Sequence, residues 1–290
     1  MNSSNVEVNK ITFQNSSMNK LQNPLYTIDP HIYCSGTILV NDIPVIDWHG
    51  EETRNGGYLG GIDINHVLLQ TGKYKVIGKM FPRKGETTLT EEEAMLIEFY
   101  CADADPRIWK SSKYKFHPKI ESPWDGLSEN IKYPYFEIST EIEVELPFVL
   151  DGWQNSVDLS KLDKNVLKEK VLEYYRQIHA VLKEHNAGRF LELSKEKQIL
   201  QEQAFYFTAE RKQSFQKSLI ALFNQNLDLE PLNENELKLE FIGYGKLVRL
   251  MKIDGSQPLQ FKSPNPKEQS NIELEIKLHV RTPEKGFSII

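Results

Sequence analysis

The chain has 290 residues, of which 39% are hydrophobic and 26% charged, as in an ordinary globular protein. Its length suggests two domains of about 150 residues each. No apolar run approaches the roughly 20 residues that span a bilayer. The polar N-terminus lacks the apolar segment of a secretory signal. These features exclude a membrane-spanning protein and predict a cytoplasmic one.

Charge is distributed unevenly along the chain. The net charge is −6, and residues 1–150 hold 14 Lys and Arg against 21 Asp and Glu, a balance of −7. A nucleic-acid-binding protein needs a clustered basic surface, so that class is disfavoured. The two cysteines, Cys34 and Cys101, match neither a disulfide framework nor a zinc spacing. We expect both to be buried thiols.

The first half of the chain is typical of short β-strands separated by turns. Residues 1–24 are polar and predict a flexible arm. Strand-like runs follow at 31–40, 43–49, 72–82, 93–105 and 136–150, and Asn41-Asp42 is typical of a hairpin turn. We expect residues 106–133 to form a long loop. The pattern predicts an antiparallel β-sandwich or jelly roll over residues 25–152.

The run 136–150 alternates with period 2, which is typical of a half-buried strand. Its apolar side chains are those of Ile138, Ile142, Val144 and Leu146. Its opposite face carries Glu141, Glu143 and Glu145. These carboxylates predict either a solvated sheet face or, in a sharper interpretation, a docking surface for a basic partner.

After residue 152 the period changes to that of helices. A helix is predicted within 164–188, with Asp163 or Ser160 as its N-cap and a stop at 186–188. Its apolar face comprises Leu167, Val171, Tyr174, Tyr175, Ile178 and Leu182. A second helix is predicted over roughly 195–225. Further strands are predicted at 237–245, 246–254, 257–262, 272–280 and 286–290.

The C-terminal half, residues 153–290, resembles the NTF2-like family in the order of its elements. The residues that carry the resemblance are the helix YYRQIHAVL, the QAFYF segment, and the run FIGYGKLVRLMKIDGSQPLQF. The resemblance implies helices wrapped by a curved antiparallel sheet with an open interior. In enzymes of this family, acid and base side chains line that interior. Tyr174, Tyr175, His179 and His185 are therefore candidate pocket residues. The interpretation favoured here is structural, with packed aromatic rings and a histidine in the last turn of the helix.

The stretch DWHGEETRNGGYLGGIDINH contains potential metal ligands in Asp47, His49 and His66. The interpretation favoured here is structural: a strand ends at Trp48, a glycine-rich connection follows, and a strand resumes near Tyr58. No metal or other cofactor is predicted. The stretch lacks the lysine of a phosphate-binding loop, and no GxSxG nucleophile motif occurs. No catalytic residue is therefore assigned.

The sequence thus predicts an α+β protein whose function is non-enzymatic protein recognition. A concrete version is a bacterial immunity or accessory protein that neutralises a basic effector. Its candidate contacts are Glu141, Glu143, Glu145, Trp109 and Trp124, because aromatic side chains dominate binding hot spots. A small-molecule enzyme or ligand-binding protein, using the C-terminal pocket, is one alternative. A carbohydrate-binding module, using the tryptophans, is another.

Overall fold

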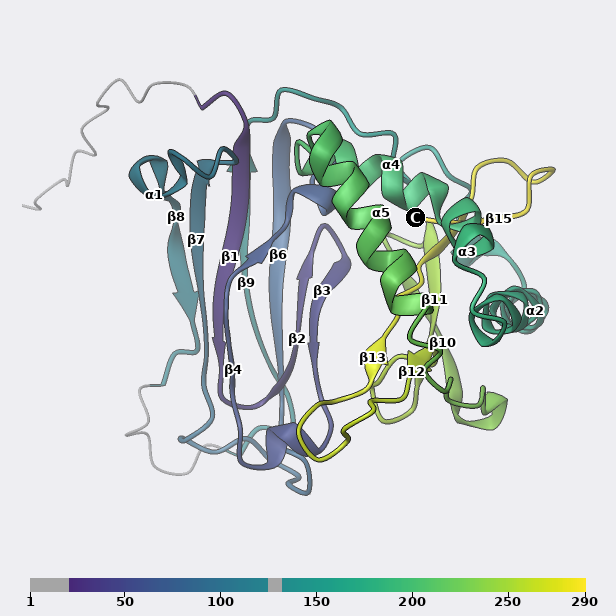
Figure 1. Ribbon diagram of the computed structural model, residues 1–290. Helices are drawn as coiled ribbons and strands as arrows, with labels where there is room; N and C mark the ends of the chain where they lie inside the picture. Colours follow the sequence, from purple (N-terminus) through teal and green to yellow (C-terminus); the bar gives the residue numbers. More distant parts are fainter. Residues whose placement is uncertain (1–20, 125–131) are drawn as a thin grey trace, which may run out of the picture.

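The structure is a computed structural model that describes residues 21–124 and 132–290. A strand-rich N-terminal half lies beside a C-terminal half in which helices cover a smaller sheet (Figure 1). The protein is therefore a mixed α+β protein, with about 26% helix and 33% strand, as the sequence predicts. Most of the predicted arm, residues 1–20, lies outside the described residues.

Two antiparallel sheets form the N-terminal sandwich. The first sheet has the order β4-β1-β7-β8, with β5 also paired to β1. Its strands are β1 Pro24–Ile32, β4 Tyr58–Leu59, β5 Ile62–Asp63, β7 Met95–Asp103 and β8 Tyr114–Glu121. The second sheet has the order β3-β2-β6-β9. Its strands are β2 Ser35–Val40, β3 Ile43–Trp48, β6 Gly72–Phe81 and β9 Phe136–Val144.

Local sequence signals explain several of these strands. The β2–β3 hairpin turns at Asn41 and Asp42, whose φ angles of 56° and 60° are those that a two-residue hairpin turn requires. In β9, Ile138, Ile142 and Val144 are buried, whereas the glutamates between and after them are exposed. The hairpin and the alternating strand are confirmed.

The region that was predicted as a long loop is partly regular. It contains the short helix α1 Trp109–Ser112 and the strand β8. β8 pairs only with β7 among the described strands, and none of its residues is fully buried, although Tyr114, Phe116 and Ile120 pack partly against the core. β1 also begins earlier than predicted, and its two prolines lie on its buried face. Pairing with β7 along its whole length holds β1 extended in spite of them.

Four helices form the outer layer of the C-terminal half. α2 spans Lys164–Lys183, and its Asp163 N-cap accepts hydrogen bonds from the backbone of Asn165 and Val166, as the sequence predicts. α3 Ala187–Leu193, α4 Lys195–Ala204 and α5 Ala209–Phe223 follow. The prediction of one helix over 195–225 is wrong, because Tyr206 has a φ of 52° and Thr208 caps a new helix. Short 3-10 turns occur at Glu51–Arg54, Asn65–Val67, Leu159–Lys161 and Glu234–Glu236.

The C-terminal sheet has the antiparallel order β10-β11-β14-β15, and β12 pairs separately with β13. Its strands are β10 Leu237–Ile242, β11 Leu247–Lys252, β14 Leu278–Val280 and β15 Phe287–Ile289. The separate pair is β12 Gln260–Phe261 with β13 Ile272–Glu273. The run predicted as one strand over 272–280 is therefore divided between two sheets.

The apolar core of the sandwich continues into the C-terminal half. Leu200 and Ala204 of α4, together with Ile242 and Leu247, are buried in the same cluster as the sandwich interior. A second cluster lies between α2 and the C-terminal sheet. The change from strands to helices occurs near residue 152, where the sequence indicates it, but the two halves share one core. In the part of the chain that the structure describes, no helix combines the length and apolarity needed to cross a membrane.

Candidate functional site at the interface of the two halves

A cleft of about 690 Å³ lies between the sandwich and the C-terminal sheet. One wall is the outer face of the β3-β2-β6-β9 sheet, and the other is formed by β10 and β11. Alternation along β2 and β6 turns Thr37, Lys79 and Phe81 away from the sandwich core and into this cleft. The loop that follows β6 supplies Arg83 and Lys84 at the rim.

The floor of the cleft is a buried ion network centred on Arg249. This side chain is 2% exposed. Its guanidinium donates to Asp47 of the sandwich at 2.7 Å and to Glu240 at 2.9 and 3.0 Å. Burial alone would lower the pKa of Arg249, and the two carboxylates instead raise it above its usual value. The guanidinium therefore ties both halves together and stays charged.

A hydroxyl–imidazole pair lies beside this network. Thr37 Oγ1 is 2.9 Å from His49 Nε2 and 3.2 Å from Asp47 Oδ1. The Asp47 carboxylate accepts from Arg249 through Oδ2 and from the Thr37 hydroxyl through Oδ1. His49 Nε2 must then donate to the hydroxyl, which leaves its Nδ1 unprotonated. Burial lowers the pKa of His49, so the ring is neutral near pH 7.

This pair differs from a catalytic triad in one respect. In a triad the carboxylate orients the imidazole, and the imidazole takes the proton of the hydroxyl. Here Asp47 contacts the hydroxyl, and the hydroxyl proton is already committed to it. The arrangement orients His49 within the cleft, and it does not activate Thr37 as a nucleophile.

A second, polar cavity of about 230 Å³ adjoins the cleft along Pro44, Asp47 and Gly255. Glu275, Lys277 and His66 lie on its other walls. Lys277 pairs with Glu275 at 2.5 Å. Burial would raise the pKa of Glu275, but Lys277 and the nearby Lys197 outweigh it and lower the pKa to about 2.

Two further titratable groups close to this cavity are shifted by burial. The pKa of Lys197 falls to about 8 because its ammonium is buried, although it donates to the Glu275 carbonyl at 2.8 Å. The pKa of His66 falls to about 4 for the same reason. Perturbed ionisable groups around a cavity are typical of functional sites. The interface is therefore the strongest candidate site in the protein.

The structure brings the predicted ligand residues Asp47, His49 and His66 to this interface but does not combine them into a metal site. Asp47 and His49 line the cleft, whereas Asp47 and His66 line the adjoining cavity. The glycine-rich connection between them forms the loop, turn and short strands that the structural interpretation predicts.

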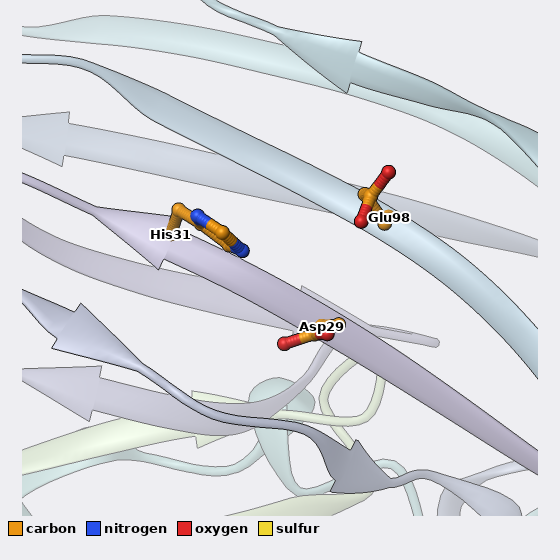
Figure 2. Close-up of side chains that lie close together, drawn as sticks. All are labelled: Asp29, His31 and Glu98. Carbon is orange, nitrogen blue, oxygen red and sulfur yellow. The ribbon is translucent and has the colours of Figure 1, made fainter.

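Across residues 21–124 and 132–290, one group of three potential metal ligands lies close together, and it was not predicted. Asp29 and His31 of β1 and Glu98 of β7 present ligand atoms within 4.8 Å of one another on the outer face of the first sheet (Figure 2). The Glu98 carboxylate already accepts from Lys115 and Tyr100, each at 2.7 Å. A metal ion would have to displace the lysine, so we do not assign a metal centre here.

The candidate pocket residues of the C-terminal half are engaged in packing. The Tyr175 hydroxyl is buried, donates to the Ile276 carbonyl at 2.8 Å and accepts from the Leu250 amide at 3.1 Å. His179 and His185 each contact a backbone carbonyl at 2.9 Å through Nε2, those of Glu230 and Leu227. Tyr174 is half-buried and packs on Phe287. None of the four lines the cleft or the adjoining polar cavity.

The candidate partner contacts also have local partners. Glu141 and Glu143 lie opposite Lys75 and Lys73 on β6, and Lys73 reaches Glu141 at 3.3 Å, so the acidic stripe faces a basic one. Glu145 is exposed just beyond β9. Trp124 is buried, and its indole donates to the Glu93 carbonyl at 2.6 Å, which removes it as a surface platform. Trp109 is half-buried near Lys113.

Sequence reasoning missed Arg249, Glu275 and Lys277, which form much of the interface. A usable signal exists, because Arg249 interrupts the apolar run LVRLM and Lys277 interrupts IKLH. A charge within an otherwise apolar strand indicates a buried, paired group. Two partners are close in sequence, because Glu240 lies opposite Arg249 on the neighbouring strand and Glu275 is two residues from Lys277. Asp47 is 202 residues from Arg249 and leaves no local pattern.

The interface thus combines an open cleft, a buried ion network and an adjoining polar cavity. Comparisons of the chain with protein-family models, with curated proteins and with solved structures gave no match.

Proposed function

We propose that the chain is a non-enzymatic recognition protein and that the cleft between its two halves is the docking site for a protein partner. The observation that carries the proposal is the state of the cleft floor. Its polar side chains are paired with one another, as in Asp47 with Arg249 and Thr37 with His49. The floor is therefore built for rigidity, and the open walls remain for recognition.

The walls have the composition of a binding hot spot. Phe81 lines the cleft, and its ring centroid lies 5.7 Å from that of His49. Tyr135, which is 40% exposed, packs on Phe81 at a centroid distance of 5.2 Å but is not itself a lining residue. Aromatic rings supply large contact areas at low conformational cost. Arg83, at the rim, is held by the Thr53 and Gly56 carbonyls, so it meets a partner in a fixed position.

The rim carries charges of both signs, which suits a protein surface with a complementary charge pattern. The residues that line the cleft include the basic Lys79, Lys84 and Lys238 and the acidic Asp42 and Asp254. The stripe of Glu141 and Glu143 lies on the same sheet face, but the lysines of β6 balance it. We therefore place the docking site for the partner in the cleft, and we do not assign the acidic stripe a direct contact with the partner.

Within this proposal, a bacterial immunity or accessory protein that neutralises a basic effector is the concrete version. It is supported by the balance of −7 over residues 1–150. We also retain the NTF2-like resemblance of the C-terminal half as a proposal, supported by helices that precede and cover an antiparallel sheet.

A second candidate function is binding or conversion of a small molecule in the same cleft. It is favoured by one observation, the neutral His49 ring whose Nδ1 is free to accept a proton. Carbohydrate binding on a tryptophan platform is disfavoured by the burial of Trp124.

The experiment compares partner capture by variants of the full-length protein in lysate of its native host. We expect Phe81→Ala with Tyr135→Ala to weaken capture at least tenfold, because two hot-spot rings are removed. The matched control is Trp109→Ala, which removes a half-buried ring outside the cleft. Charge reversal of Glu141, Glu143 and Glu145 tests the acidic stripe separately.

Unchanged capture by the cleft variant, combined with loss after reversal of the three glutamates, would move the docking site to the stripe. Thermal stabilisation by small molecules that is abolished by His49→Phe, with no partner captured, would favour the second candidate function.

A further inference from the structure

The cavity that adjoins the cleft contains two buried polar atoms without a hydrogen-bond partner. They are Gln257 Oε1, on a side chain that is 7% exposed, and His66 Nδ1. Both residues line the cavity, together with Val45, Glu273 and the residues that it shares with the cleft. Such buried atoms are rare, because each costs the free energy of its lost hydration. Gln257 Oε1 is therefore free to receive a donor from a bound group, whereas the His66 ring also interacts with the Asp63 backbone.

The charge of the cavity wall selects the kind of donor. Three carboxylates line the cavity, those of Asp47, Glu273 and Glu275, against the single cation of Lys277. Asp47 is paired with Arg249, and Glu275 with Lys277. Among the described residues, no Lys, Arg or His lies within ion-pair distance of Glu273, whose carboxylate accepts from the neutral Gln260 amide at 3.0 Å. Burial raises the pKa of Glu273, so an incoming cation would stabilise its ionised form.

An anion is excluded by these carboxylates, and a bare metal ion is disfavoured by their spacing. Asp47, Glu273 and Glu275 do not form a group of ligand atoms within 4.8 Å, unlike the cluster on the first sheet. Separated acceptors suit an extended organic cation that carries several N–H donors. The position of Glu273 at the exposed rim provides an entrance, and Gln257 lies inside.

We propose that this cavity binds a guanidinium or primary ammonium group, the tip of an arginine or lysine side chain of the partner in the cleft. Assigning the cation to a partner rests on the proposed function. The cation would donate to Glu273 at the rim and to Gln257 within. The neutral imidazole of His66, with one nitrogen lone pair, completes the set of acceptors. Residues of β3 in the sandwich and of β13 in the C-terminal half line the cavity, and both strands are labelled in Figure 1.

The direct test uses small probes and the full-length protein without a partner. N-Ethylguanidinium and n-butylammonium are titrated into the protein while backbone amide chemical shifts are recorded. Propionate is the anionic control and n-butanol is the uncharged control. We expect saturable shifts around His66 and Lys277 with the two cations only. Glu273→Gln should weaken cation binding at least tenfold, and Gln257→Leu should weaken it as well. The matched control Glu284→Gln changes an exposed carboxylate elsewhere and should leave binding unchanged.

Four results would overturn the inference: no saturable cation binding, equal shifts with propionate, binding that survives Glu273→Gln, or a crystal structure of the soaked protein with ordered water only in the cavity. Partner capture separates this inference from the proposed function. If Glu273→Gln abolishes probe binding but leaves capture unchanged, the cation is not supplied by the partner. The opposite outcome is also informative. If the probes bind to the cavity, but the Phe81 and Tyr135 variant still captures the partner normally, the cation site is supported and the docking site in the cleft is refuted.

Discussion

Arg249 shows how much a single residue determines at the interface. It is buried on β11 among apolar neighbours, and its guanidinium meets carboxylates from both halves of the chain. A buried pair contributes little net stability compared with an apolar replacement of both partners, but removal of one partner leaves a buried charge unpaired. The residue therefore enforces the relative position of the two halves.

Arg249→Met should lower the free energy of unfolding by about 3–5 kcal/mol, because Asp47 and Glu240 lose their cation in a buried site. Denaturant titration measures the loss. Arg107→Met, which alters an exposed pair with Asp105, serves as the control and should leave stability unchanged. If the Arg249→Met protein were as stable as wild type, the ion network would not hold the two halves together.

His66 should make stability depend on pH. Burial lowers its folded pKa to about 4, whereas an unfolded histidine titrates near 6.5. As the pH falls from about 6.5 to about 4, the unfolded state gains a proton that the folded state resists, so stability falls; above pH 6.5 this contribution is constant.

We expect His66→Phe, which keeps the ring contact with Phe205, to abolish the uptake of about one proton in this range. Denaturant titrations between pH 4 and 8 test this. Because His49 and His279 also have lowered pKa values in both proteins, the difference between variant and wild type is the relevant quantity. Parallel pH curves would contradict the prediction.

At the scale of elements, glycines on one sheet of the sandwich leave room for a side chain from the other sheet. A Cβ on Gly78 of β6 would lie 2.5 Å from Met95 Sδ and 3.0 Å from Ile138 Cγ1. The Met95 side chain fills the space that Gly36 and Gly78 leave open. A strand glycine that is otherwise unfavourable therefore has a packing role.

Gly78→Ala should destabilise the protein by about 1–3 kcal/mol through overpacking. Met95→Ala should cost less in that background than in wild type, since it removes the clashing atoms. Double-mutant denaturation measures this coupling. Gly188→Ala, in the exposed helix α3, is the matched control and should be neutral or stabilising. Additive effects of the two substitutions would refute the contact.

At the scale of the whole molecule, the halves should unfold as one unit. The sandwich core includes Leu200 and Ala204 of α4, and the buried Asn65 amide donates to the carbonyls of both Pro24 and Ala204. Shared apolar burial and a shared polar anchor favour a single cooperative transition.

Leu200→Ala should lower stability by about 2–5 kcal/mol and should shift two signals together. Tryptophan fluorescence reports mainly on the sandwich, and circular dichroism at 222 nm reports on α2–α5. Ile199→Ala, one residue away and 55% exposed, should leave both midpoints unchanged. Separate midpoints for the two signals would show that the halves are independent domains.

The sequence alone determined the elements whose information is local. The period of β9, the N-cap and apolar face of α2, and the hairpin turn at Asn41 and Asp42 arise from neighbours within a few residues, so they could be predicted. The tertiary structure decided the rest. β1 and β8 depend on pairing with β7, and the site depends on Asp47 meeting Arg249 about 200 residues later in the chain. At the break between α4 and α5, the Tyr206 side chain contacts Phe148 and the Pro24 carbonyl, which are distant in sequence. The fold alone brings the charges of Asp47 and Arg249 together and excludes water around them, and no local pattern records that arrangement.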